Sequence, residues 1–454
     1  MTQLTKFPSG SMRELFTLSV PLMLSALSGN LMVVFDRLVL SHYSLEAMNA
    51  AAAAGMMAMI FIYGAIGIVS IAEVFVGQFN GSKQYEKVAK PVWQMVWFSL
   101  FLSIVYYPLS YFGAPYLLTD YYYFEYGFPY FHTLLLFASL FPLQVAIASF
   151  FIGLGKVKLV TICTILGNVL NVLLDLLLVF GWEPIFPAMG TKGAAIATGI
   201  SQGIQVLILF IFFVNRKNRN QYKTHVCSFN FTLFKKCLRV GVPSAAGHMF
   251  EIAAWAVITA YMATLGTLYL TVVTMGQTFY SLVAFSMEGL QKGVAAVASN
   301  CIGSGSWDKI KDSWNSAVKL LLLFALFLSL LLIFYPGVVL DVFLSHADNT
   351  QDLKQLYPLL RVVSISIWIY LILDGLTWIS AGFLTADGDT VFIMVLNALS
   401  SWIFAILPMY VSIEFFHISP AYIWININFY ALVNAICFYW RFRIRLKKQE
   451  QRLL

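Results

Sequence analysis

The segment LFTLSVPLMLSALSGNLMVVFDRLVLS, residues 15–41, decides the fold class of this chain. It is long and apolar enough to cross ~30 Å of hydrocarbon as one α-helix. Similar segments recur along all 454 residues, which are 60% hydrophobic and only 11% charged, with a mean hydropathy of +0.80. Because lipid offers unpaired backbone groups no water, such segments are expected to be helical. The sequence therefore predicts an all-α membrane protein.

We expect twelve membrane-spanning helices in two bundles of six. Their predicted ranges are 15–41, 47–72, 93–113, 132–152, 159–181, 193–214, 236–262, 268–298, 315–343, 362–384, 392–413 and 420–443. The longest polar stretch lies between the sixth and seventh helices. We therefore predict an N-terminal bundle at 1–214, a cytoplasmic linker at 215–235 and a C-terminal bundle at 236–454.

Two short matches at a constant offset of 222 residues relate the two halves. Val20-Pro21 corresponds to Val242-Pro243, and the segment 81–88 corresponds to 303–310. Since both halves begin on the same side, their pseudo-twofold axis is expected to lie along the membrane normal. The second match also predicts a short helix along the membrane surface in each half. Parallel repeats of this kind are a feature of transporters.

Basic residues indicate the orientation of the chain, because cytoplasmic loops are enriched in Lys and Arg. Of the 28 Lys and Arg residues, 24 fall in segments predicted to lie inside, so both termini are predicted to be cytoplasmic. This bias accounts for the net charge of +7, and nucleic-acid binding is not needed to explain it. We expect a monomeric multi-pass protein in a bacterial inner membrane, in contact with lipid.

Six carboxylates lie inside the predicted spans. They are Asp36, Glu73, Asp175, Glu251, Glu288 and Asp374. A charge at the bilayer centre costs ~2.5 kcal/mol or more, so intramembrane acids are candidate functional residues. Glu73 and Glu288 lie near inner helix ends, where snorkelling to the interface or pairing with Lys83 or Lys292 is predicted.

One predicted group of polar residues lies in the N-terminal half. Asn168, Asn171 and Asp175 share one helix face, and Asp36 and Thr198 are predicted at a similar depth. Oxygen atoms of Asp36, Asn171, Asp175 and Thr198 could enclose a sodium ion, or the two acids could hold a proton between them. The alternative for Asn168 and Thr198 is a role in helix pairing.

A second predicted group lies in the C-terminal half, near mid-membrane. Trp255 is one turn from Glu251, and Tyr370 is one turn from Asp374. Carboxylates beside aromatic faces suit an organic cation, which gains from charge pairing and cation–π contact. The alternative is that both aromatic residues only fill the core. His248 is isolated in the sequence and is predicted to be structural.

Several motifs occur in order along the whole chain. They are Val20-Pro21 followed by Asp36; Val76-Gly77-Gln78-Phe79-Asn80-Gly81; Gly153-Leu154-Gly155-Lys156 followed by Asn168-Val169-Leu170-Asn171 and Asp175; Gly190-Thr191-Lys192-Gly193-Ala194-Ala195-Ile196-Ala197-Thr198; and Asp374 followed by Gly388-Asp389-Thr390. In this order and spacing the chain resembles the multidrug and toxic compound extrusion (MATE) family. The resemblance implies two six-helix bundles forming a V, and export of cationic drugs driven by inward sodium or protons.

The resemblance also carries site residues over by position. The cation site in the N-terminal lobe of DinF-like members corresponds to Asp36, Asn171, Asp175 and Thr198. The acids in the C-terminal lobe of NorM-like members correspond to Glu251 and Asp374. This mixture leaves the coupling ion open. Family members often carry an arginine in the segment 384–388, whereas the inner loop here holds two acids, Asp387 and Asp389, and no base.

The leading prediction is a cation-coupled antiporter that exports organic cations and needs no cofactor. One alternative is a lipid-linked saccharide flippase of the same superfamily, whose pyrophosphate should require basic residues, yet Arg37 is the only basic residue well inside a span. A less favoured alternative is an intramembrane lipid-modifying enzyme, which should show clustered histidines and acids near one interface. The six histidines form no such cluster in the sequence, so we expect a secondary transporter rather than an enzyme.

Overall fold

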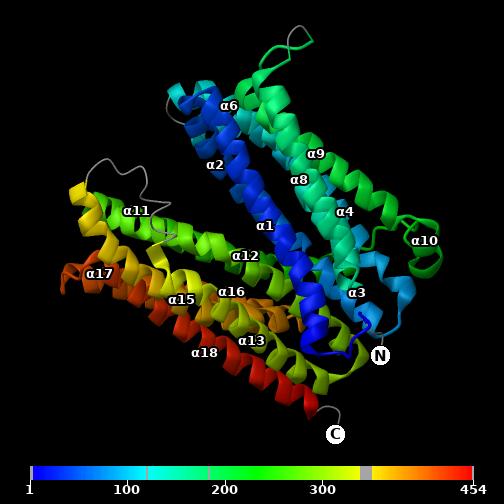
Figure 1. The fold of residues 1–454 in the computed structure, drawn as a ribbon. Coiled ribbons are helices and arrows are strands. Elements are labelled where there is room, and N and C mark those ends of the chain that lie inside the picture. Colours follow the sequence, from blue (N-terminus) through cyan, green and yellow to red (C-terminus); the bar gives the residue numbers. More distant parts are fainter. Residues whose placement is uncertain (1–3, 119–120, 183–184, 338–349, 452–454) are drawn as a thin grey trace. The chain divides into compact units, whose positions relative to one another are not determined.

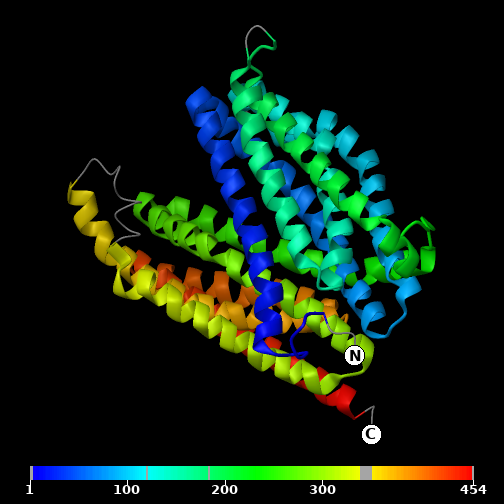
Figure 2. The ribbon, with the colours of Figure 1, turned by 45° about the vertical axis from the view of Figure 1, so that its right-hand side comes forward.

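The computed structural model describes residues 4–118, 121–182, 185–337 and 350–451 (Figures 1 and 2). Within these ranges the chain is built from α-helices joined by short 3-10 and π-helical turns. An isolated β-bridge between Trp182 and Phe186 is the only β-type pairing among these residues.

The helices of the first half are α1 (Met12–Tyr43), α2 (Leu45–Val69), α3 (Ala72–Gly81), η1 (Tyr85–Lys87), α4 (Ala89–Pro108), η2 (Leu109–Gly113), α5 (Ala114–Leu117), α6 (Tyr121–Phe137), α7 (Leu140–Gly153), α8 (Val157–Phe180), α9 (Gly190–Phe213) and α10 (Arg216–Tyr222). Those of the second half are α11 (Phe231–Leu265), α12 (Thr267–Ser304), α13 (Trp307–Ser329), η3 (Leu330–Phe334), α15 (Thr350–Ala386), α16 (Thr390–Ser400), η4 (Ser401–Ile406), α17 (Leu407–Glu414), η5 (Pro420–Tyr422) and α18 (Ile423–Glu450).

Twelve helical segments in the described part of the chain are long and apolar enough to cross a membrane. Each coincides with one predicted helix, and most ends differ by only a few residues. The second predicted helix comprises α2 and α3, which together form the segment Leu45–Gly81. The predicted end of the ninth helix, residue 343, lies outside the described residues. The predicted all-α fold class with twelve membrane-spanning helices is therefore confirmed.

The chain forms two compact units that do not follow the sequence strictly. Unit 1 comprises Met1–Leu4, Pro21–Ala245 and Ser299–Gly305. Unit 2 comprises Thr5–Val20, Ala246–Ala298 and Ser306–Leu454. Residues of α1, α11 and α12 thus contribute to both units. The predicted boundaries at residues 214 and 236 stay a prediction.

Small residues let the helices of unit 1 approach one another closely. Helix α2 packs against α6, α4 against α7, and α8 lies beside α9 (Figure 1). Ala54 and Ala58 of α2 are fully buried with Phe131 and Leu134 of α6 in one apolar cluster. Since lipid is as apolar as these side chains, close packing rather than exclusion from water favours such helix pairs.

The short surface helices predicted from the repeat are wrong in both halves. Residues 85–87 form only the 3-10 turn η1, and the corresponding residues of the second half are the first turn of α13, which begins at Trp307. The polar start of α13 continues without interruption into its apolar residues. A separate surface helix therefore has no residues from which to form.

The repeated glycines instead permit a close backbone contact inside unit 1. A Cβ atom on Gly81 of α3, or on Gly303 at the end of α12, would lie 2.1 Å from a carbonyl oxygen of the opposite segment. Beside them, Asn80 Nδ2 donates to Asn300 Oδ1 (2.7 Å), and Asn300 Nδ2 donates to the carbonyl of Gly153 (2.9 Å). These bonds join α3, α7 and the end of α12.

The segment 223–230, which follows α10, is attached to α4 by side-chain hydrogen bonds. Trp93 Nε1 donates to the carbonyl of Thr224 (3.0 Å), and Gln94 Nε2 donates to the carbonyl of Ser228 (3.0 Å). Gln94 Oε1 accepts from the backbone N–H of Asn230 (2.8 Å). This connecting segment is therefore part of the packed surface of unit 1.

In unit 2, α18 packs along α15 and supplies the bases that the loop after α15 lacks. Arg441 Nε donates to Asp389 Oδ2 (2.7 Å), and Arg445 Nε donates to Asp387 Oδ2 (2.6 Å). Burial raises the pKa of Asp387, and the guanidinium of Arg445 opposes that shift. The two acids found in this loop are thus neutralised by residues more than 50 positions later in the chain.

Candidate ion and cargo sites

Unit 1 holds two buried acids on adjacent helices. Asp36 of α1 and Asp175 of α8 are only 8% and 0% exposed. No donor among the described residues hydrogen-bonds either carboxyl oxygen of Asp175, whereas the carboxyl of Asp36 lies within hydrogen-bonding reach. Two ionised carboxylates cannot hydrogen-bond each other, so a hydrogen bond between these acids would need a proton on one of them. Burial without donors makes a fully ionised pair costly.

Asn171 and Thr198 complete this group. In the orientation that satisfies both polar atoms of the Asn171 amide, Nδ2 donates to Asp36 Oδ1 (2.9 Å) and Oδ1 accepts from the backbone N–H of Thr198 (3.2 Å). The hydroxyl of Thr198 donates to the carbonyl of Ala194 in its own helix (3.0 Å). The structure therefore brings Asp36, Asn171, Asp175 and Thr198 together, as their predicted depths indicated.

Asn168 makes a different kind of contact. Its Nδ2 donates to Ser28 Oγ of α1 (2.9 Å), and nearby Thr161 Oγ1 donates to the carbonyl of Pro21 (2.8 Å). These bonds hold α8 against α1 without involving the acids. The geometry agrees with helix pairing for Asn168.

Tyr130 of α6 lies near this group and was not predicted from the sequence. Its phenol lies within electrostatic reach of Asp36, Asp175 and Arg37. Arg37 itself is exposed on α1. No sequence pattern indicated Tyr130, because α6 is rich in aromatic residues and only the packing of α6 shows which one lies near the acids.

Unit 2 holds the second pair of acids. Asp374 of α15 is buried, and its Oδ2 accepts a 2.5 Å hydrogen bond from the phenol of Tyr280 on α12. Glu251 of α11 lies within electrostatic reach of Asp374. The structure therefore brings the predicted acids together and adds Tyr280, which the sequence analysis missed.

Aromatic rings surround these acids. The Trp255 ring lies edge-on to Tyr370, with centroids 6.4 Å apart, and it lies 6.0 Å from Trp424. Tyr280 lies edge-on to Tyr370, with centroids 5.1 Å apart. Edge-to-face pairs of this kind hold aromatic side chains in fixed orientations. Trp255 and Tyr370 thus belong to one cluster with the acids, as predicted.

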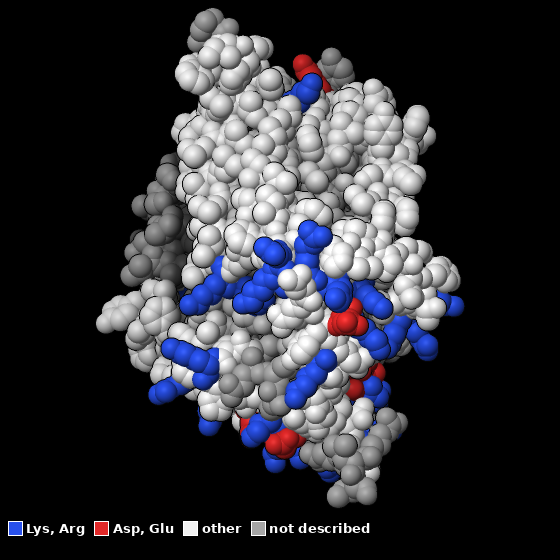
Figure 3. Space-filling view, turned by 90° about the vertical axis from the view of Figure 1, so that its right-hand side faces the viewer, with Lys and Arg blue, Asp and Glu red and all other residues white. Residues whose placement is uncertain are grey.

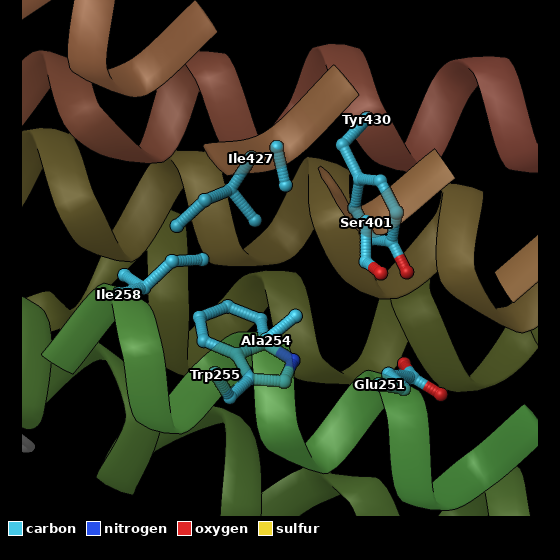
Figure 4. Close-up of a pocket in the computed structure, with 8 residues that line it drawn as sticks. Glu251, Ala254, Trp255, Ile258, Ser401, Ile427 and Tyr430 are labelled. Atoms are coloured by element: carbon cyan, nitrogen blue, oxygen red, sulfur yellow. The ribbon is translucent and has the colours of Figure 1, made fainter. Parts of the chain in front are cut away.

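A small pocket opens beside this aromatic cluster (Figure 4). Its lining residues are Glu251, Ala254, Trp255, Ile258, Ser401, Ala405, Ile427 and Tyr430. Glu251, Ser401 and Tyr430 lie together at one end, and Ile258 and Ile427 lie at the other. The indole of Trp255 lies between the two ends. A ligand that carries a cationic group on an apolar body matches this distribution.

His248 is not isolated, contrary to the prediction. Its Nδ1 lies 3.6 Å from Glu251 Oε2, one turn along α11, and its ring is edge-on to Trp378 at 6.1 Å. The i, i+3 spacing was the sequence signal for this contact. The predicted pairing of Glu288 with Lys292 is confirmed, with Oε1 and Nζ 2.6 Å apart.

No group of three or more His, Cys, Asp or Glu side chains in the described part of the chain could hold a metal ion. A sodium ion in unit 1 would therefore need the amide and hydroxyl oxygens of Asn171 and Thr198 beside the two acids.

Twelve apolar helices with buried acids in each of two units define a multi-pass membrane protein of the transporter class. The MatE family profile matches residues 21–177 and 243–411, and the chain belongs to this family. As a MatE protein it is a secondary transporter and not an enzyme.

Relatives and solved structures agree with this assignment. The chain is 23% identical to a probable multidrug resistance protein NorM from Pasteurella multocida, with 86% of this chain and 84% of that protein covered. It is 24% identical to a NorM protein from Synechocystis, with 96% of each covered. A MOP superfamily transporter from Pyrococcus furiosus has a TM-score of 0.86 at 18% identity, with 98% and 97% covered. An outward-facing MATE family transporter has a TM-score of 0.86 at 19% identity, with 97% of each covered.

Proposed function

We propose that this chain is an antiporter that exports organic cations in exchange for inward-moving cations. The observation that carries this proposal is an acid pair in each unit: Asp36 and Asp175 are both buried, and the buried Asp374 lies near the partly buried Glu251. The pair in unit 1 requires a proton or a cation, and the pair in unit 2 adjoins a pocket with an aromatic wall. The names of the relatives from Pasteurella multocida and Synechocystis, probable multidrug resistance proteins, support an exported drug as cargo.

Protons are the coupling ion that the geometry of unit 1 favours. With its NH2 group toward Asp36, the Asn171 amide satisfies both of its polar atoms, and in that orientation it donates to the acid and cannot be a ligand of a cation. A proton shared by Asp36 and Asp175 supplies the hydrogen bond that Asp175 otherwise lacks. Sodium would instead use the other orientation of the Asn171 amide, in which Nδ2 lies 3.3 Å from Thr198 Oγ1 and the carbonyl oxygen faces Asp36. We therefore assign the proton to this pair and treat sodium as the alternative.

The cargo site is assigned to the pocket of unit 2. Glu251 supplies negative charge at the end with the hydroxyl groups, and Trp255 supplies an aromatic face. Tyr370 packs edge-on against Trp255, and Tyr280, which packs against Tyr370, donates a hydrogen bond that fixes the Asp374 carboxylate. The charged residue that lines this pocket is an acid, Glu251, which disfavours a pyrophosphate and hence a lipid-linked saccharide as cargo.

We also propose the oligomeric state, the membrane and the topology of this transporter. We place it as a monomer in a bacterial inner membrane with both termini in the cytoplasm, with no cofactor and no nucleic-acid partner. The bundles at 1–214 and 236–454, joined by the linker 215–235, are the proposed transport lobes.

Transport of ethidium in proteoliposomes tests this function, with proton and sodium gradients imposed separately. A proton gradient should drive ethidium against its own gradient, and a sodium gradient at equal pH should not. Sodium-driven transport without a response to pH would assign sodium to the same residues. If neither gradient drives ethidium transport, antiport is contradicted. If the protein then flips a lipid-linked pyrophosphate sugar, the flippase alternative is established. Glu86→Gln is the matched control, because Glu86 is exposed and distant in sequence from both acid pairs.

A further inference from the structure

One rim of unit 1 carries basic residues with almost no acids among them. The segments 82–90, 154–159 and 214–239 together hold twelve Lys and Arg residues and a single acid, Glu86. All twelve basic side chains are exposed. They are Lys83, Lys87, Lys90, Lys156, Lys158, Arg216, Lys217, Arg219, Lys223, Lys235, Lys236 and Arg239. Figure 3 shows basic side chains gathered in a band with few acidic ones beside it.

Three of the segments that carry this charge are fixed around one buried ring, that of Tyr222 at the end of α10. Tyr85 of η1 lies edge-on to it at 6.0 Å, and Phe150 of α7 does so at 5.4 Å. Nζ of Lys156 lies over the same ring, 5.5 Å from its centroid. The basic residues of η1, α10 and the start of α8 are therefore held together by packing.

The charges of this cluster are not neutralised within the protein. None of the ion pairs formed by the described residues includes any of the twelve. Removal from water and, to a smaller extent, the nearby Lys217 lower the pKa of the Lys156 ammonium. Like charges that are held close together repel each other. An anion bound between them therefore lowers the electrostatic energy of the cluster.

Two of these lysines also occupy unfavourable backbone conformations. Lys83 and Lys223 have φ angles of 60° and 56°, in the left-handed region where glycine is preferred after a helix. A glycine would adopt these conformations more easily than a lysine. Such outliers are a reason to look for a function of the side chain.

Apolar side chains continue the cluster on one side. Val226, Phe229 and Phe231 are 45%, 47% and 67% exposed, in the connecting segment and at the start of α11. The attachment of this segment to α4 keeps them beside Lys223 and Lys235. A partner with an anionic head and a hydrophobic body would contact both surfaces, whereas inorganic phosphate or RNA would leave the apolar residues exposed.

We propose that this rim of unit 1 binds the phosphate headgroup of an anionic phospholipid, with Lys156 and Lys217 as its central ligands. The acyl chains lie along Val226, Phe229 and Phe231. The general enrichment of Lys and Arg in inner loops explains the number of these charges, but not the packing of the segments that carry them around Tyr222 with a single acid among them. The site is separate from both acid pairs and independent of the cargo.

Native mass spectrometry of the full chain in detergent tests this site, with phosphatidylglycerol and phosphatidylcholine of identical acyl chains as probes. Wild type should retain phosphatidylglycerol at least fivefold better than phosphatidylcholine. A lysine near anionic lipid contributes about a fivefold gain in binding, so Lys156→Gln with Lys217→Gln should lose roughly 25-fold. Lys156→Arg with Lys217→Arg should keep binding, which separates lost charge from lost folding.

The matched control is Lys309→Gln with Lys311→Gln. It removes the same charge from unit 2, where Lys309 already pairs with Asp312 at 3.3 Å. This control should retain phosphatidylglycerol within twofold of wild type. Equal losses of phosphatidylglycerol binding in the two Gln variants would mean that only the net charge of the protein matters, and would overturn the site. Displacement of the lipid by equimolar inorganic phosphate, or no preference between the lipids in wild type, would overturn it as well.

Discussion

The phenol of Tyr280 and the carboxylate of Asp374, 94 residues apart in the chain, share a 2.5 Å hydrogen bond at the centre of the aromatic cluster of unit 2. Because the acceptor is an acid, this bond is stronger than one between neutral groups. The ring of Tyr280 also packs edge-on against Tyr370. One residue therefore links the orientation of the acid to that of the aromatic wall.

Removal of this hydroxyl should weaken export while the fold persists. Tyr280→Phe keeps the ring and deletes a bond to a charged group worth ~1.5–3 kcal/mol, so the apparent affinity for a cationic cargo should fall by roughly tenfold or more. The measurement is ethidium efflux against cargo concentration. Tyr261→Phe is the control, since that phenol donates to the exposed Glu414 (2.8 Å), outside the pocket. Equal behaviour of the two variants would remove Tyr280 from the site.

Glu251 and Asp374 should each be needed for export. Glu251→Gln and Asp374→Asn should reduce drug resistance severely at near-normal expression, because replacing a buried acid by its amide keeps the shape of the side chain. Resistance and membrane expression are measured together, with Glu414→Gln as the exposed control acid. Wild-type resistance in both variants would assign these two residues to packing.

Asp36 and Asp175 should act as one coupling site. Expelling a monovalent cation against a hundredfold gradient costs ~2.8 kcal/mol, which an inward ion must supply. Asp36→Asn and Asp175→Asn should each abolish uphill export and still permit downhill exchange. The double variant should be no worse than either single variant, because each removes the same shared proton. Efflux compared with counterflow measures both properties, and intact ion-driven efflux in Asp36→Asn would contradict the site.

The orientation of the chain can be checked by labelling. In a Cys227→Ser background, needed because Cys227 is exposed, cysteines placed at Tyr122 and His417 should react with an impermeant maleimide added outside intact cells. A cysteine at Asn220 should react only after the membrane is opened. Outside labelling at Asn220 would reverse the topology, the direction of transport and the leaflet of the proposed lipid site.

The position of a residue along its helix was predictable from the sequence, and rotation about each helix axis was not. Hydropathy fixes helix ends to within a few residues, so Asp36, Asn171, Asp175 and Thr198 were expected at one level and do meet. The partner of an acid on another helix depends on how that helix is turned. For this reason Tyr280 was missed beside Asp374.

Two other features of the structure could not be predicted from the residues nearby in the sequence. The loop after α15 looked unpaired because its arginines come from α18, at Arg441 and Arg445. The repeat at Gly81 and Gly303 suggested surface helices, whereas it marks positions where two backbones touch. Both relationships depend on contacts between segments far apart in the chain, which a single sequence does not reveal.

The hydrogen bond between Asn80 and Asn300 also has a consequence for biosynthesis. The two residues are separated by 220 positions, and Asn300 belongs to the piece of α12 that completes unit 1. A nascent chain that has inserted its first six helices still lacks this piece. Unit 1 therefore cannot finish packing until the ribosome has made α11 and α12, and a translation product that stops at the midpoint should be degraded rather than accumulate.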